Sequence, residues 1–367
     1  MLRILLAGLI LVAPVSLRAA DAQTEITWYG FFKGDLAYDT AASSHGNFAM
    51  WVKAHADGAE EATHNLTANQ TRIGFNMKRE DVTGKLEFDF YGGNAQNKSY
   101  IQLRKAYVDL PLGPVMLRAG QDSDVISPLV PSTINYTVCW GAGNIGYRRP
   151  QMRVYHQSGG LYWAAALARN ITPDLDGNAI VDGEDSALPV VQGRLAYTFD
   201  AGDAKVTLGG SGHYGMMDTP ALAGEDGYST WSANGEAAIV LSPRLKVLGE
   251  FYTGSNLATY FGSILNADTV DGLASLGGWA NVQFKATDDL ALSLGGAYDS
   301  VDEDDLAGAG ARSANQVIFA NAQKTIGSGV KAGVEVSYWA TEYPNAPVGT
   351  EGEPANLRVQ FAITGSI

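Results

Sequence analysis

The chain has 367 residues, 43 of them Gly and only one Cys, and a formal net charge of -14. A single Cys excludes an internal disulfide, and the excess of acids excludes nucleic acid as a partner, because nucleic-acid binding rests on clustered Lys and Arg. Abundant Gly, with 10% aromatic residues, favours sheets joined by many turns over a helical fold.

The N-terminal segment has the features of an export signal. Residues 4–15 form an almost unbroken apolar run, which is the length of a signal-peptide core. Ala20-Asp-Ala22 is a small-x-small pattern and predicts cleavage before Gln23, with a cut after Ala20 as the alternative. We therefore expect a signal peptide over 1–22 and a single exported domain over 23–367. No later stretch is long and apolar enough to predict a transmembrane helix.

Alternating polarity continues through the rest of the chain. The clearest run puts Leu357, Phe361 and Ile363 on one face and Arg358 and Gln360 on the other. This pattern predicts sixteen strands, over 25–38, 69–79, 83–92, 99–110, 114–121, 150–158, 161–169, 190–199, 204–214, 230–241, 244–253, 276–286, 289–299, 314–325, 329–339 and 354–365.

The connections between these strands alternate between short and long. Ser242-Pro243 and Thr287-Asp288 are tight turns, whereas 39–68 and 122–149 are long. This rhythm is typical of outer-membrane barrels, with short periplasmic turns and long external loops. The sequence therefore predicts an all-β fold, a 16-stranded antiparallel transmembrane β-barrel. A soluble β-sandwich is the alternative, because it shows the same alternation.

Five runs in the first half of the chain resemble the DcaP-type trimeric porins, within the general bacterial porin superfamily. They are Asn69-Gln-Thr-Arg-Ile-Gly-Phe75, Leu86-Glu-Phe-Asp-Phe-Tyr-Gly92, Leu103-Arg-Lys-Ala-Tyr-Val-Asp-Leu110, Ala119-Gly-Gln-Asp122 and Tyr147-Arg-Arg-Pro-Gln-Met-Arg-Val154. The resemblance implies a homotrimer in the outer membrane of a Gram-negative bacterium, surrounded by its lipids. It also implies a third loop folded into the barrel, and together with the arginines it points to a dicarboxylate or similar small organic anion.

Charged side chains on the polar faces are expected to line the pore. The predicted set comprises Lys33, Asp35, Arg72, Glu87, Asp89, Arg104, Arg118, Arg153 and Arg194, together with Asp122 and Asp124 of the third loop. A guanidinium keeps its charge when buried and offers a fork of donors to carboxylates. We expect four of the arginines, 72, 104, 118 and 153, to form a basic ladder opposite the two loop acids, and so to create a transverse field. The alternative is that the arginines only neutralise nearby acids.

Three further features qualify this expectation. Lys105 shares the parity of Leu103, which predicts a charge facing lipid unless the strand is bulged, the side chain snorkels or the position lies at a subunit interface. Cys139 is expected to be a small packed residue without chemistry. An EF-hand-like spacing predicts a calcium loop, with an acidic solvated loop as the alternative; its ligands would be Asp174, Asp176, Asn178, Ile180, Asp182 and Asp185.

The expected function is an outer-membrane diffusion channel, a porin for small hydrophilic solutes that favours small organic anions. Apart from the calcium ion, no cofactor is expected. No enzyme is expected, because the five His are scattered without ligand spacing and no nucleophile motif occurs. Two alternatives stay open: an exported adhesin or structural β protein, and an outer-membrane barrel hydrolase.

Overall fold

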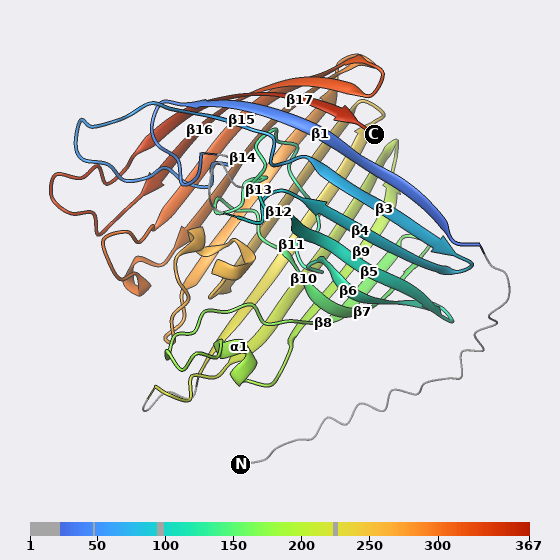
Figure 1. Cartoon of the computed structure of the whole chain (residues 1–367), viewed down its shortest axis with the longest axis horizontal. Coiled ribbons are helices and arrows are strands. Elements are labelled where there is room, and N and C mark those ends of the chain that lie inside the picture. Colours follow the sequence, from blue (N-terminus) through green and yellow to red (C-terminus); the bar gives the residue numbers. More distant parts are fainter. Residues whose placement is uncertain (1–22, 47, 94–98, 223–226) are drawn as a thin grey trace.

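The wall of the molecule is one closed antiparallel sheet. The structure, a computed structural model, describes residues 23–46, 48–93, 99–222 and 227–367, so the predicted signal peptide lies outside the described residues. From β3 (Arg72–Arg79) to β17 (Ala355–Ser366) each strand pairs with the next one in the chain, and β1 (Glu25–Asp39) pairs with both β3 and β17, which closes the barrel (Figure 1). Within these described ranges, no helix is long and apolar enough to cross a membrane.

The strands between these follow in order. They are β2 (Thr63–Thr67), β4 (Val82–Asp89), β5 (Gln102–Leu112), β6 (Val115–Ser123), β7 (Arg148–Ser158), β8 (Leu161–Ala168), β9 (Val190–Ala201), β10 (Ala204–Met217), β11 (Tyr228–Ser242), β12 (Leu245–Ser255), β13 (Ala274–Lys285), β14 (Leu290–Val301), β15 (Ala314–Gly327) and β16 (Val330–Glu342). Short helical segments lie in the connections: α1 (Asp182–Asp185), η1 (Ala258–Tyr260), η2 (Ser263–Leu265) and η3 (Glu303–Asp305).

The wall has the sixteen strands that the sequence predicts. β2 and β3 both pair with β1, at Asp35–Asp39 and Glu25–Phe31 respectively, so they are two parts of one wall strand. The alternation predicted no strand over β2, whose residues carry a single large apolar side chain, Leu66. Short connections such as 113–114 gather at one end of the barrel, the turn end, and long ones such as 256–273 at the other, the loop end (Figure 1).

Alternate side chains face outward and inward along each strand. In β17, Leu357, Phe361 and Ile363 are exposed, whereas Arg358 and Gln360 are buried. The exposed side chains of the other strands are also largely apolar, which is the surface that a membrane barrel presents to lipid. The predicted parity of the last strand is therefore confirmed.

A bulge in β5 explains the charge that the alternation assigned to lipid. Glu87 pairs with Lys105 whereas the next residue, Phe88, pairs with Leu103, so Arg104 is an extra residue in the ladder. The bulge lets Arg104 and Lys105 both turn inward, where Lys105 Nζ lies 2.8 Å from Asp122 Oδ1. Of the three explanations left open for Lys105, the bulge is the one that the structure supports.

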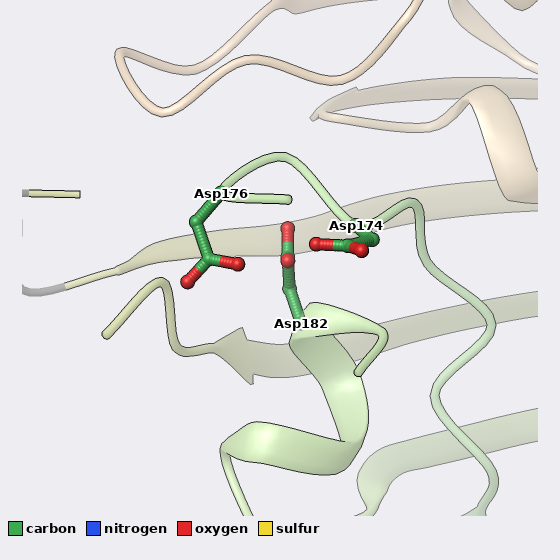
Figure 2. Close-up of side chains that lie close together, drawn as sticks. All are labelled: Asp174, Asp176 and Asp182. Carbon is green, nitrogen blue, oxygen red and sulfur yellow. The ribbon is translucent and has the colours of Figure 1, made fainter. Parts of the chain in front are cut away.

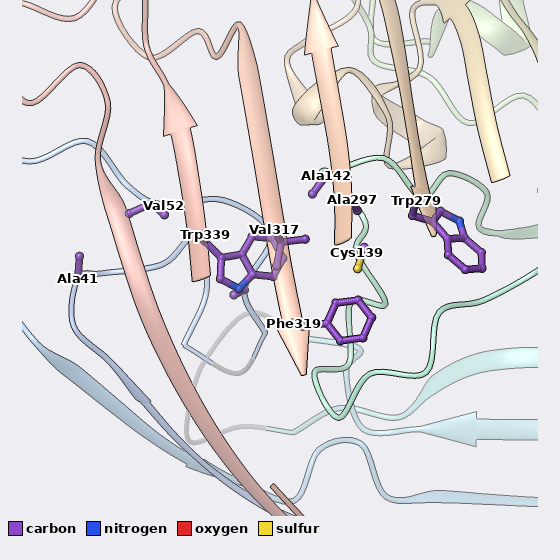
Figure 3. Close-up of a cluster of buried hydrophobic side chains, with 10 residues drawn as sticks. Ala41, Val52, Cys139, Ala142, Trp279, Ala297, Val317, Phe319 and Trp339 are labelled. Atoms are coloured by element: carbon purple, nitrogen blue, oxygen red, sulfur yellow. The ribbon is translucent and has the colours of Figure 1, made fainter. Parts of the chain in front are cut away.

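The third long connection, residues 124–147 (loop 3), lies inside the barrel. Its apolar middle packs against the inner wall: Cys139 and Ala142 belong to one buried cluster with Trp279, Phe319 and Trp339 (Figure 3). Ala41, Ala49 and Val52 of the first long connection join the same cluster. Cys139 is therefore a small packed residue, as predicted.

Candidate functional site

Loop 3 is held to the wall through its own main chain. Side chains of the wall form hydrogen bonds with the backbone of loop 3 every one to three residues. These side chains come from strands between β9 and β16 and from β1. The amide N–H groups of residues 125, 127, 129, 132, 134 and 135 donate to Gln192, Ser211, Glu250, Asn281 and, twice, Glu335, while the carbonyls of 132 and 134 accept from Asn321 and Lys33. Pro128 and Pro131, which have no N–H to donate, occupy positions between these anchors.

A cavity of about 460 Å³ lies between loop 3 and the wall. Its volume is within the range of small-molecule sites, roughly 300–1,000 Å³. Apolar side chains of loop 3, such as Ile126, Pro128 and Val130, form one part of the lining. Arg72, Arg104 and Arg148, together with Phe31 and Tyr136, form another part, and we call this space the constriction cavity.

Arg104 is neutralised by two acids of the wall. Its Nε lies 2.8 Å from Glu87 Oε1 and its Nη1 lies 2.5 Å from Asp89 Oδ2. Burial raises the pKa of Tyr136, so its hydroxyl stays protonated and donates to Asp89 at 3.2 Å. Arg72 has a looser contact, with 3.6 Å from its Nε to Glu87 Oε1.

Arg148 carries the least compensated charge on the cavity. It is buried and its guanidinium lies 4.3 Å from the centroid of the Tyr147 ring, but within the described part of the chain it forms no ion pair. Arg148 Nη2 and Arg72 Nε are buried donors without a hydrogen-bond acceptor. Both guanidiniums line the cavity and keep unused hydrogen-bonding capacity, so both attract an anionic guest.

The prediction that Asp122 and Asp124 face the arginines across the pore is wrong for both acids. Asp122 belongs to strand β6, not to the loop, and contacts Lys105, Arg118 and Arg153 directly. Asp124 does line the cavity, but its carboxylate lies 2.7 Å from Arg149 Nε and accepts from Gln192. Each acid therefore compensates its own neighbours, because the strand ends bring them within contact distance.

The other predicted pore residues face the lumen in local ion pairs. Arg118 lies between Asp109, at 2.6 Å, and Asp122, and its guanidinium stacks 3.7 Å from the centroid of Tyr107. The remaining pairs are Arg194 with Glu236 at 2.5 Å, Lys33 with Asp35 at 3.0 Å, and Arg153 with Asp122 at 3.6 Å. Of the predicted ladder, only Arg72 and Arg104 line the constriction cavity.

Arg148 was missed because the sequence offers little to identify it. The predicted sixth strand began at 150, whereas the corresponding strand β7 begins at Arg148, so the residue fell into the predicted loop. The only available signal was its place in the Tyr147-Arg-Arg-Pro run that carries the family resemblance.

The acidic loop brings together three of its six predicted calcium ligands. Carboxylate oxygens of Asp174, Asp176 and Asp182 lie within 4.8 Å of one another (Figure 2). Burial and these two acidic neighbours raise the pKa of Asp182, although Tyr228 and the Leu175 amide bond its carboxylate.

The other three predicted ligands are used differently. Asn178 donates to Asp185 at 2.8 Å and its side-chain oxygen accepts from the Ile180 amide at 2.7 Å. An Asx-type turn therefore orders this part of the loop by its own hydrogen bonds. Calcium binding stays a prediction.

Comparison with known proteins gives one family. A family model described as DcaP outer membrane protein matches residues 14–256. No curated protein matches the chain.

Solved structures share the fold at low identity. The outer membrane channel DcaP of Acinetobacter baumannii is 17% identical, with a TM-score of 0.77 over 95% of this chain and 99% of that chain. OmpF of Salmonella typhi, solved with daunomycin, is 13% identical, with a TM-score of 0.62 over 93% and 97%. A trimer form of OmpT of Vibrio cholerae is 12% identical, with a TM-score of 0.56 over 95% and 100%.

Proposed function

Because the chain belongs to the DcaP outer membrane protein family, we propose that it is a diffusion channel favouring small organic anions, dicarboxylates among them. Membership places the protein in the outer membrane of a Gram-negative bacterium. The turn end would then face the periplasm and the loop end the outside, as in other outer-membrane barrels.

The constriction cavity is the observation that supports anion preference. Arg72 and Arg148 both line this cavity and neither guanidinium is fully paired, so one solute with two carboxylates can contact both of them. Among the described residues, Asp124 is the only one that brings a carboxylate to the lining, and Arg149 occupies it. A solute dianion therefore meets donors and little opposing charge.

The experiment measures the reversal potential of the purified protein in a planar bilayer under a tenfold KCl gradient, with and without succinate. We expect reversal toward the chloride potential and block of the current by succinate. Arg148→Gln should weaken that block about tenfold, the loss expected for one charged hydrogen bond. Arg169→Gln, at an exposed arginine paired with Glu184, is the control and should leave the block unchanged.

Other outcomes would favour the alternatives. Strong cation selectivity without block by succinate would contradict anion preference and leave a general diffusion channel. An absence of conductance would return the adhesin and barrel-hydrolase functions to consideration. The family and the solved neighbours named as channels or porins favour conductance.

The channel is also proposed to be a homotrimer within the lipid bilayer. The trimer form of OmpT supports this assignment through a shared fold. Mass measurement by light scattering in detergent, corrected for bound detergent, tests it: a mass of one protomer would contradict the trimer.

A further inference from the structure

Three cavities adjoin between loop 3 and the turn end. The constriction cavity shares Phe31, Gln70 and Thr133 with a second cavity of about 160 Å³. The second shares Gln323 and Lys331 with a third cavity of about 370 Å³. Shared lining residues make the three spaces neighbours, so they lie in a row beneath loop 3 towards the turn end, and we call this row the path.

Basic side chains follow this path on the inner wall. Lys33 and Lys331 both line the second cavity. Each is paired in the sheet with Thr364 of β17, Lys33 from one side and Lys331 from the other. Lys246 lines the third cavity and stands opposite Gln283. Directly opposed residues project from the same face of a sheet, so these lysines project into the lumen with the other inner-wall residues.

The third cavity has a surplus of positive charge. Its two acids are already paired: Asp288 lies 2.9 Å from Lys285, and Asp289 lies 3.7 Å from Lys324. Its other three basic residues, Arg244, Lys246 and Lys331, form no ion pair anywhere in the described ranges of the chain. The path therefore runs from the arginines of the constriction cavity, past Lys33 with its partner Asp35, to the unpaired Lys246 and Lys331.

We propose that this chain of cavities is a second anion-binding station, which captures anions at the turn end and connects the constriction to the periplasm. The proposal rests on the proposed anion channel and adds the route and the residues to it. A mouth lined by one sign of charge raises the local concentration of the opposite ion and its association rate. Several weak sites in a row also let an ion leave each of them readily.

The test compares succinate block from each side of the same single channel at 0.1 M KCl. Lys246→Gln/Lys331→Gln should lower the association rate of block about threefold or more from one side only. Block from the other side should keep its rate, because the constriction cavity is intact.

Lys78→Gln/Lys205→Gln is the matched control. It removes the same charge at the same end of the barrel, from the inner faces of β3 and β10, but neither lysine lines the three cavities. An equal loss in both double variants would overturn the path and leave only a general field. An unchanged rate in Lys246→Gln/Lys331→Gln would also overturn it, whereas a native channel without any block would refute the anion channel itself.

Discussion

Asp124 and Arg149 form the most completely buried ion pair at the base of loop 3. Arg149 is 0% exposed, and its guanidinium lies 3.8 Å from the centroid of the Tyr260 ring. Asp124 also accepts from Gln192 at 2.7 Å and from the Tyr147 amide at 2.8 Å. A buried pair contributes little net stability, but losing one partner leaves an uncompensated charge.

We therefore predict that Arg149→Met destabilises the barrel strongly. Removing the partner of a buried charge costs about 3–5 kcal/mol, and urea unfolding in lipid vesicles, followed by Trp fluorescence, measures the free energy of unfolding. The double variant Asp124→Asn/Arg149→Met should recover much of the loss, since it leaves no unpaired charge. A free energy of unfolding for Arg149→Met within about 1 kcal/mol of the native value would contradict this account.

At the scale of single residues, the sequence predicted which side chains face inward better than it predicted their partners. Arg72 and Arg104 were expected on the pore and line the cavity. Asp122 was expected across the pore from Arg118 but contacts it directly. The alternation of side chains between the two faces of a strand follows from the backbone. Which side chains of separate strands form ion pairs depends on register and bulges, which the sequence pattern does not specify.

Loop 3 depends on a few carboxylates of the wall. Glu335 is buried on β16 and accepts from the amides of Ile134 at 2.6 Å and Asn135 at 3.1 Å. Its Oε2 also accepts from Asn321 Nδ2 at 3.0 Å. Both loop amides donate to this carboxylate, so removing the side chain leaves them without an acceptor.

We predict that Glu335→Ala loosens loop 3 without opening the barrel. An unsatisfied buried amide costs about 1–3 kcal/mol, which corresponds to an increase in exchange rate of about fivefold or more. Hydrogen exchange with mass spectrometry should show the increase in peptides covering 129–137, with more open-channel current noise. Glu342→Ala, at an exposed residue of the same strand, is the control. Equal exchange of these peptides in both variants would show that loop 3 does not depend on the Glu335 carboxylate.

The loop between β12 and β13 contains a pH-sensitive acid. Burial, and to a smaller extent Asp182, raise the pKa of Asp268 to about 6 from an ordinary 3.8, although the Ala258 amide contact lowers it. The folded loop then holds the proton more tightly than the unfolded chain. This stabilisation is fully present below about pH 4 and is lost as the pH rises through 6.

We predict that the loop covering 256–273 is better protected at pH 5 than at pH 7.5. Hydrogen exchange, corrected for the intrinsic pH dependence of exchange, should show this difference in the native protein. Asp268→Asn should remove most of the difference, because the amide does not titrate. Asp271→Asn, at an exposed acid of the same loop, should keep it; loss of the difference in this control would assign the effect to another group.

Whole strands were the elements best predicted from the sequence. The strands at 274–285 and 314–327 were predicted at 276–286 and 314–325, so their bounds differ by at most two residues. The path of loop 3 through the lumen was expected from the family resemblance. Its anchors lie on β9, β12 and β16, far along the chain, so no local pattern could reveal them.

The two ends of the whole barrel differ in charge. At the loop end acids dominate, among them the exposed Asp57, Glu60, Glu61, Asp302, Glu303, Asp304 and Glu353. At the turn end acids and bases are mixed, and the unpaired Lys246 and Lys331 line the third cavity. An anion approaching from the loop end is therefore repelled, whereas one at the turn end is attracted.

We predict opposite salt dependences of succinate block from the two sides. The Debye length falls from about 10 Å at 0.1 M to about 3 Å at 1 M, so salt screens both mouths. The association rate should rise with salt from the loop end and fall with salt from the turn end. As a control, the rate of liposome swelling in a neutral sugar, osmotically balanced with KCl, should not change with salt. If the association rate of block depended on salt in the same way from both sides, the charge asymmetry would be contradicted.

The main-chain anchoring of loop 3 has a consequence for how such channels diverge. Wall side chains hold the loop by its backbone, and among the described residues the loop side chains Val130 and Thr133, which line the cavity, form no hydrogen bond to the wall. Substitution at these positions can alter the size and polarity of the opening while the loop stays seated. A family can then broaden its range of solutes by changing a few side chains, and protein engineers can use the same positions to retune the channel.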